Sequence, residues 1–170
     1  RLAKRKSIVK QPDFQKLFFD YFGKEPRKVT YAVRKDSNRY HDFIFLMSLI
    51  HDAQFKISET SLRRKRLVFS LNRLCWELGS IKIDETLSEL FATKSKLTFF
   101  PVESLEWTLS HDWYSAEYQT DIEDLWMDRS ENTDTPRIVM DGLGWRCSIV
   151  LSNWDFTLRL EDLERPHIPN

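Results

Sequence analysis

Histidine is followed directly by aspartate three times in this chain, at His41-Asp42, His51-Asp52 and His111-Asp112. An imidazole and a carboxylate together can hold a divalent metal ion that activates water for hydrolysis. His41 and His51 fall in one predicted helix, where ten positions separate them by about 15 Å along the axis, too far to share an ion. A metal-dependent hydrolase using His51, Asp52 and His111 is therefore only an alternative, and we expect no metal and no cofactor.

Other signatures of catalysis are weak. No GxGxxG or GxxxxGK[ST] motif predicts a phosphate-cradling loop, and no GxSxG motif predicts a nucleophilic serine. Carboxylates gather between residues 117 and 128, where two of them could act as acid and base on a substrate, although a solvated acidic surface is the main interpretation. They are Glu117, Asp121, Glu123, Asp124 and Asp128. A small-ligand-binding protein or an enzyme with a pocket between helix and sheet thus stays an alternative.

Four consecutive cations form the strongest basic feature, the run Arg63-Arg64-Lys65-Arg66. Such a run could neutralise phosphates while neighbouring aromatic rings stack on bases. The sequence pI of about 7.1 and the lack of RNP, KH or zinc-binding patterns argue against this interpretation. Nucleic-acid binding through Arg63, Arg64 and Arg66 is therefore a second alternative, and a nucleic-acid partner is disfavoured.

The chain contains six tryptophans, at positions 76, 107, 113, 126, 145 and 154. The buried faces of predicted strands explain most of them. Trp113 and Trp126 stand beside acidic residues such as Asp124, and tryptophan is enriched at the centres of protein interfaces. We therefore expect Trp113, Trp126 and Asp124 to contact a protein partner.

A formal net charge of zero hides a strong asymmetry along the chain. Residues 1–110 carry a net charge of +8 and residues 111–170 a net charge of −8. If the two parts pack closely, these charges neutralise each other. If they do not, the folded protein has separate basic and acidic faces that steer a charged partner.

Alternating apolar residues over positions 137–162 organise the predicted fold. One set is Trp145, Cys147, Ile149 and Leu151, and a second is Trp154, Phe156, Leu158 and Leu160. A period of two predicts strands with one buried and one solvated face. Ser152-Asn153 supplies a turn, so we expect consecutive antiparallel strands in a single sheet.

Helical periodicity is clearest in the first third of the chain. The spacing of aromatic residues predicts a helix over 12–22, and a segment that is apolar nearly all round predicts a buried helix over 40–53. Short strands are predicted at 28–34, 67–71, 96–100 and 104–109, with a polar connection over 54–66 and a short helix over 84–92.

Size and composition indicate one folded domain. At 170 residues with 41% hydrophobic residues, the chain can bury a core without disulfides, and Cys75 and Cys147 are expected to be buried thiols in a reducing compartment. No segment predicts a signal peptide or a membrane span. We therefore expect a cytoplasmic protein that does not associate with a membrane.

These observations predict a single α+β domain over residues 1–170, with residues 1–10 and 164–170 at its periphery. Its antiparallel sheet is expected to have about six to eight strands, with two N-terminal helices on one face. The main functional hypothesis is a non-catalytic protein-binding module that binds a protein partner or self-associates. Charge separation and surplus tryptophan motivate it.

Overall fold

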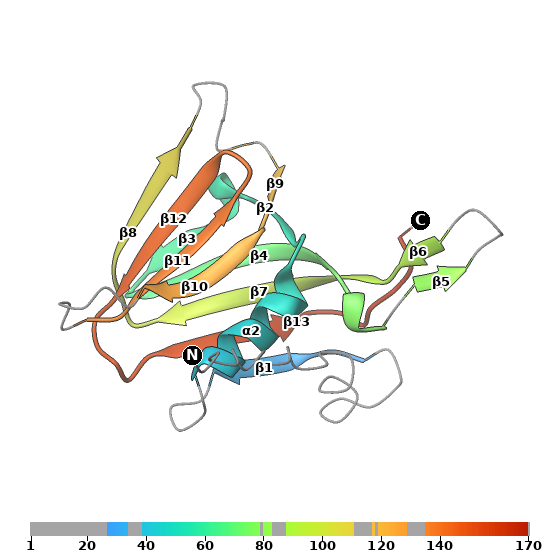
Figure 1. The fold of residues 1–170 in the computed structure, drawn as a ribbon, viewed down its shortest axis with the longest axis horizontal. Coiled ribbons are helices and arrows are strands. Elements are labelled where there is room, and N and C mark those ends of the chain that lie inside the picture. The colour runs from blue at the N-terminus through green and yellow to red at the C-terminus, as the bar shows by residue number, and fades with distance from the viewer. Residues whose placement is uncertain are drawn as a thin grey trace, which may run out of the picture.

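The computed structural model describes residues 27–33, 39–78, 80–82, 88–110, 117, 119–128 and 135–169. Within them the protein is mainly antiparallel β-structure with one short helix, α2 (Arg39–Ile50) (Figure 1). The strands are β1 (Thr30–Val33), β2 (Gln54–Lys56), β3 (Ser61–Arg63), β4 (Arg66–Leu74), β5 (Ser80–Lys82), β6 (Ser88–Leu90), β7 (Ala92–Phe100), β8 (Val102–Leu109), β9 (Gln119–Asp121), β10 (Asp124–Asp128), β11 (Arg137–Gly142), β12 (Trp145–Leu151) and β13 (Thr157–Asp162). Two 3₁₀ helices, η1 (Ile57–Glu59) and η2 (Trp76–Leu78), complete the elements.

The strands form two main sheets. The larger has seven strands in the order β1-β13-β7-β4-β2-β9, with β3 paired to β4 as a branch. The smaller has four strands in the order β10-β11-β12-β8, and β5 and β6 form a separate two-stranded sheet. All pairs are antiparallel.

Alternating side chains give each main sheet one buried face. In β12 the buried residues are Trp145, Cys147, Ile149 and Leu151, as the period of two predicts, and in β4 the buried apolar residues are Leu67, Phe69 and Leu71. Since side chains alternate along a strand, the residues between them occupy the opposite, solvated face. Each main sheet therefore has an inner and an outer face.

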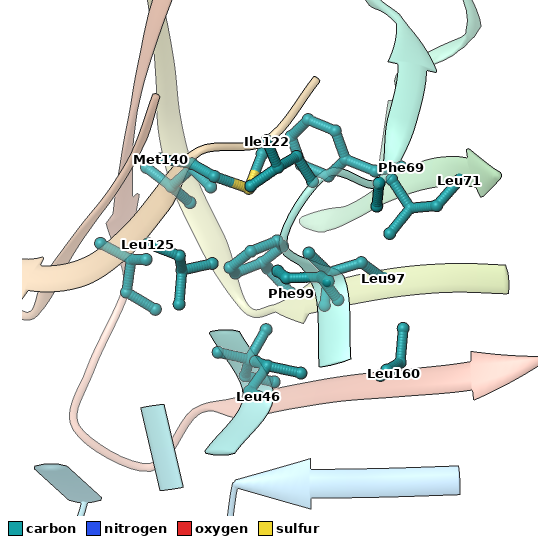
Figure 2. Close-up of a cluster of buried hydrophobic side chains, with 14 of the residues drawn as sticks. Leu46, Phe69, Leu71, Leu97, Phe99, Ile122, Leu125, Met140 and Leu160 are labelled. Carbon is teal, nitrogen blue, oxygen red and sulfur yellow. The ribbon is translucent and has the colours of Figure 1, made fainter. Parts of the chain in front are cut away.

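Helix α2 and the smaller sheet together cover the inner face of the larger sheet. Figure 2 shows Leu46 of the helix beside Phe99 and Leu97 of β7, with Leu125 and Met140 of the smaller sheet close by. Aromatic rings join the two sheets: the Phe55 ring is 5.1 Å from that of Trp145, and the Phe69 ring is 6.1 Å from that of Trp107. One continuous hydrophobic core results.

The apolar composition of α2 agrees with its position. Phe43, Phe45, Leu46, Leu49 and Ile50 are buried, so the sequence-based prediction of a buried helix is confirmed. A helix that is apolar over most of its circumference is stable only when surrounded by other elements. Here β1, β4 and β10 surround it.

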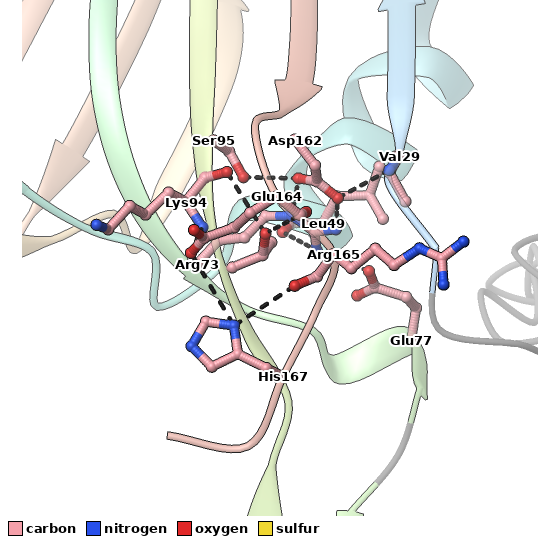
Figure 3. Close-up of polar contacts among 11 residues, drawn as sticks. Val29, Leu49, Arg73, Glu77, Lys94, Ser95, Asp162, Glu164, Arg165 and His167 are labelled. Carbon is pink, nitrogen blue, oxygen red and sulfur yellow. Dashed lines mark hydrogen bonds and ion pairs between the residues drawn. The ribbon is translucent and has the colours of Figure 1, made fainter. Parts of the chain in front are cut away.

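A buried guanidinium lies at one end of this core, below the last turn of α2 (Figure 3). Arg73 of β4 donates two hydrogen bonds to the carboxylate of Asp162, at 2.9 and 2.8 Å. It also donates to Glu77 Oε1 at 2.7 Å and to the carbonyl of Leu49 at 3.3 Å. The Arg73 side chain thus joins the larger sheet, η2 and the C-terminal end of the helix.

Asp162 extends the network to two further segments. Its carboxylate accepts hydrogen bonds from the Ser95 hydroxyl on β7 at 2.6 Å and from the Val29 backbone N–H at 2.8 Å. Both side chains of the Arg73–Asp162 pair are fully buried. Because such a pair lacks solvent, losing one partner leaves an uncompensated charge in the core.

Consecutive strands at the C-terminal end do not share one sheet, which corrects the sequence-based prediction. β12 pairs with β11 and β8 in the smaller sheet, whereas β13 pairs with β7 and β1 in the larger one. Ser152-Asn153 is therefore part of a link between sheets and not a hairpin turn. Trp154, expected on a buried face, lies in this link and is 45% exposed.

Two other predictions of local structure are wrong. The expected polar connection over 54–66 contains β2, η1 and β3, because strands of three residues are too short to show a period. The short helix expected over 84–92 is replaced in its described part by β6 and the first residue of β7. The helix predicted over 12–22, which was to be the second helix on the sheet, lies outside the described residues.

The two cysteines are free and buried, as the sequence predicts. Burial raises the pKa of the Cys75 thiol to about 12 and also raises that of Cys147, so both stay protonated. No helix among the described residues is long and apolar enough to span a membrane.

Replacing Asp162 by alanine tests the role of the buried pair. We expect Asp162→Ala to lower the free energy of unfolding by about 3–5 kcal/mol, because it leaves the Arg73 charge buried and unpaired. The neighbouring Glu161→Ala is the control, since the Glu161 side chain is exposed beside Arg159 and opposite Lys96, and losing exposed ion pairs of this kind should cost less than about 1 kcal/mol. Urea denaturation measures both, and equal effects would contradict a structural role for the buried pair.

Candidate binding surface

The outer face of the larger sheet carries a cluster of exposed cations, which we call the basic face. It consists of Arg63 of β3, Arg66 of β4, Lys94 and Lys96 of β7, and Arg159 of β13. On the described outer faces of these four strands the acidic residue is Glu161, whose carboxylate is 3.8 Å from Arg159. The surface therefore has an excess of positive charge.

The strand register brings these cations close together. Arg63 lies directly opposite Arg66, Arg159 lies opposite Thr98, and Lys96 lies opposite Glu161. Directly opposed residues have Cβ atoms about 4.5–5.5 Å apart, and like charges in such positions are destabilising. The Arg63–Arg66 pair is thus maintained at some cost in stability, whereas Lys96 and Arg159 are partly compensated by Glu161.

The hairpin between β3 and β4 positions the two arginines. Its central residues Arg64 and Lys65 have φ angles of 49° and 62°, the left-handed conformation of a type I′ turn. The Lys65 ammonium group donates to Glu103 at 2.8 Å, and the Lys65 carbonyl accepts from the Val102 N–H at 2.7 Å. The hydrogen bond from Lys65 lowers the pKa of Glu103. These bonds fix the hairpin to the start of β8.

An exposed aromatic ring adjoins the hairpin on the same face. Phe100, the last residue of β7, is 40% exposed, and the guanidinium carbon of Arg66 lies 5.6 Å from its ring centroid. A cation over a ring at this distance is a favourable arrangement. The basic face therefore ends in an arginine and an aromatic ring that contact each other.

The outer face of the smaller sheet has the opposite charge, and we call it the acidic face. Its described charged residues are Glu106, Asp124, Asp128, Asp141, Arg137 and Arg146. Arg146 pairs with Asp141 at 3.0 Å and also lies 5.6 Å from the Trp126 ring centroid. Trp126 is half-buried, and is therefore less accessible than the exposed Phe100 ring on the basic face.

The residues expected to bind a partner fall into two separate groups. Arg63 and Arg66 lie together on the basic face, with Arg64 in the adjoining turn. Trp126 and Asp124 lie on β10, on the acidic face. Trp113 lies outside the described residues. Lys94, Lys96 and Arg159 could not be predicted from the sequence as members of the same surface, because they become neighbours only through strand pairing.

The His-Asp pairs have ordinary local roles where they are described. His51 Nδ1 is 2.9 Å from Asp52 Oδ2, and both side chains are substantially exposed. Asp42 accepts a hydrogen bond from the Tyr31 hydroxyl at 2.7 Å and so ties α2 to β1. Among the described residues, no group of three or more histidine, cysteine or carboxylate side chains could hold a metal ion. His111 lies outside the described residues.

The carboxylates of residues 117–128 are spread over the surface. Asp121 belongs to β9 of the larger sheet, and Asp124 and Asp128 are the two ends of β10. Four positions along a strand correspond to about 13 Å, which exceeds the separation of paired catalytic carboxylates. Asp124 does lie directly opposite Asp141 of β11, but the Asp141 carboxylate is paired with Arg146. Their arrangement therefore resembles a solvated acidic surface.

Glu77 has the most unusual environment among the described carboxylates. Burial raises its pKa despite the charge of Arg73, and its Oε2 atom has no hydrogen-bond partner among the described residues. For Arg73, burial opposes the charged form, but the hydrogen bond to Asp162 and the charge of Glu77 outweigh it and raise the pKa. The alternation of buried apolar residues from Leu67 through Leu71 places residue 73 on the same inward face. This pattern was the signal for a buried Arg73, and it was missed in the prediction.

Comparison of the chain with family models, curated proteins and solved structures gives no match.

The raised pKa of Glu77 predicts a specific pH dependence of stability. A carboxyl group that holds its proton more tightly in the folded state stabilises the fold as the pH falls through the raised pKa toward its ordinary value of 4.5. We therefore expect wild type to gain stability relative to Glu77→Gln over that interval, with a constant difference at higher pH. Urea denaturation at a series of pH values measures it, and a relative loss on acidification would show that Arg73 dominates instead.

Proposed function

We propose that this chain is a non-catalytic binding module that uses the basic face to bind a macromolecule rich in negative charge. The observation that carries the proposal is the separation of charge between the two outer faces, with Arg63, Arg66 and Lys96 on one and Asp124 and Asp128 on the other. A neutral protein with this arrangement still presents a locally positive surface. Such a surface orients an anionic partner and raises its association rate.

The free-energy cost of the β3–β4 hairpin supports a functional role for its cations. Arg63 and Arg66 face each other directly, and the hairpin that joins them holds Arg64 and Lys65 in left-handed conformations. Non-glycine residues at positive φ are uncommon, and strain of this kind gathers at functional sites. A turn needed only for structure would be better served by asparagine and glycine.

Catalysis has less support from the described residues. The His51–Asp52 pair is a surface contact, and the carboxylates of β10 are too far apart to act on one bond. We keep the hypothesis of a binding module but place its surface on the basic face and not around Trp126, since Trp126 is half-buried whereas the basic face is exposed and ends in the exposed Phe100 ring.

Retention on heparin, a polyanion, tests whether the basic face or the net charge of the whole protein governs binding to anions. The double variant Lys94→Gln, Lys96→Gln lowers the net charge by two on the basic face, and Arg137→Gln, Arg146→Gln lowers it equally on the acidic face. We expect wild type and the second variant to elute from a heparin column at a similar salt concentration, and the first variant to elute at a clearly lower one. Equal weakening of both variants would contradict binding through the basic face.

A further inference from the structure

We infer that the partner of the basic face is a single-stranded nucleic acid, whose backbone follows the cations of β7 and whose bases stack at the end of the sheet marked by Phe100. This inference rests on the proposed function and adds the chemistry of the partner. It depends on the combination of positive charge with the exposed Phe100 ring on the same face, and on an exposed tryptophan, Trp154, in the link that adjoins this end.

Two exposed aromatic residues belong to chain segments that meet at this end. The link from β12 to β13 begins where the Ser152 N–H donates to the Pro101 carbonyl at 2.9 Å, and it ends where Thr157 pairs with Phe100. Trp154 lies within this short link, so both ends of the segment that carries it are fixed beside Phe100. The two side chains are 45% and 40% exposed, respectively.

Exposed rings of this kind suit unpaired bases. Each nucleobase has a π-face, and stacking on an aromatic side chain contributes about 1–3 kcal/mol per base. Bases also stack on arginine guanidinium planes, and Arg66 lies over the Phe100 ring. Because the Arg66 N–H groups can also donate to a phosphate, the pair can contact both parts of a nucleotide.

The cations continue from this end along the sheet. Lys96 and Lys94 lie on β7, four and six residues before Phe100, so the face extends over about 20 Å. Exposed hydroxyl groups stand between the cations, on Ser70 opposite Lys96 and on Thr157 opposite Phe100. A sugar–phosphate backbone can lie along this row of charges and hydroxyl groups, which contact phosphates and sugars and do not contact base edges.

The alternative partners use less of this surface. An acidic protein segment would need the cations but not the exposed rings, and a duplex keeps its bases stacked inside the helix. The neutral sequence pI, which disfavoured nucleic acid, has less weight because exposed cations outnumber carboxylates on the described outer face of the larger sheet, where the acidic residues of the strands are Asp121 and Glu161. Single-stranded nucleic acid is therefore the partner that the surface favours.

Fluorescence anisotropy with labelled oligo(dT) of about 15 nucleotides tests the inference. The competitors are a duplex of the same length and a polyglutamate peptide of the same charge. We expect the single strand to bind most tightly, with a slope of log K against log salt concentration of about −3 if four cations contact phosphates. Phe100→Leu, which keeps an apolar side chain but removes the ring, should weaken binding about tenfold.

Tryptophan substitutions provide the matched control. Trp154→Leu should weaken binding and reduce the quenching of tryptophan fluorescence by oligo(dT), whereas Trp76→Leu should do neither, although Trp76 is 42% exposed. Thermal unfolding shows whether each variant is folded. If Phe100→Leu does not fold, the oligo(dT) affinity of Trp154→Leu tests the inference in its place.

Two results would overturn the inference, and they are distinguishable. If polyglutamate or the duplex binds as well as oligo(dT) and loss of the rings has no effect, the partner is not single-stranded nucleic acid, but the basic face still binds anions. If oligo(dT), the duplex and polyglutamate all fail to bind and heparin retention does not depend on Lys94 and Lys96, the proposed function fails as well.

Discussion

The buried guanidinium of Arg73 is the interaction on which the arrangement of the fold depends. Its contacts reach Asp162 on β13, Glu77 in η2 and the last turn of α2 at Leu49, while Asp162 in turn binds Ser95 and the segment before β1. Except for η2, which follows β4 directly, these segments are far apart in the sequence. Because hydrophobic packing is not directional, a buried ion pair with fixed hydrogen-bond geometry is well suited to set how they meet, although it adds little net stability.

The same strands that this network fixes also create the binding surface. Arg73 and Asp162 point inward on β4 and β13, so Arg66 and Arg159, an odd number of positions away, point outward. Asn72 and Lys94 are paired across β4 and β7 in the same register. The positions of the exposed cations are thus consequences of how the inner face is packed.

Local patterns predicted the parts of this structure that depend on near neighbours. The period of two in β12 and the apolar circumference of α2 were sufficient to predict a strand and a buried helix. Assignment of β12 and β13 to different sheets could not be predicted, because strand partners are chosen by contacts distant in sequence. For the same reason the sequence indicated Arg63, Arg64 and Arg66, which are consecutive or nearly so, but not Lys94, Lys96 and Arg159, which reach the same face from other strands.

The central claim is that one face of the larger sheet binds the partner, and amide chemical-shift mapping by NMR during titration with oligo(dT) tests it most directly. We expect the largest shifts at the outward residues of β3, β4, β7 and β13, centred on Lys96, Thr98 and Phe100, with little change in the smaller sheet. Shifts concentrated instead around Trp126 and Arg137 on the acidic face, with the basic face unchanged, would contradict the account.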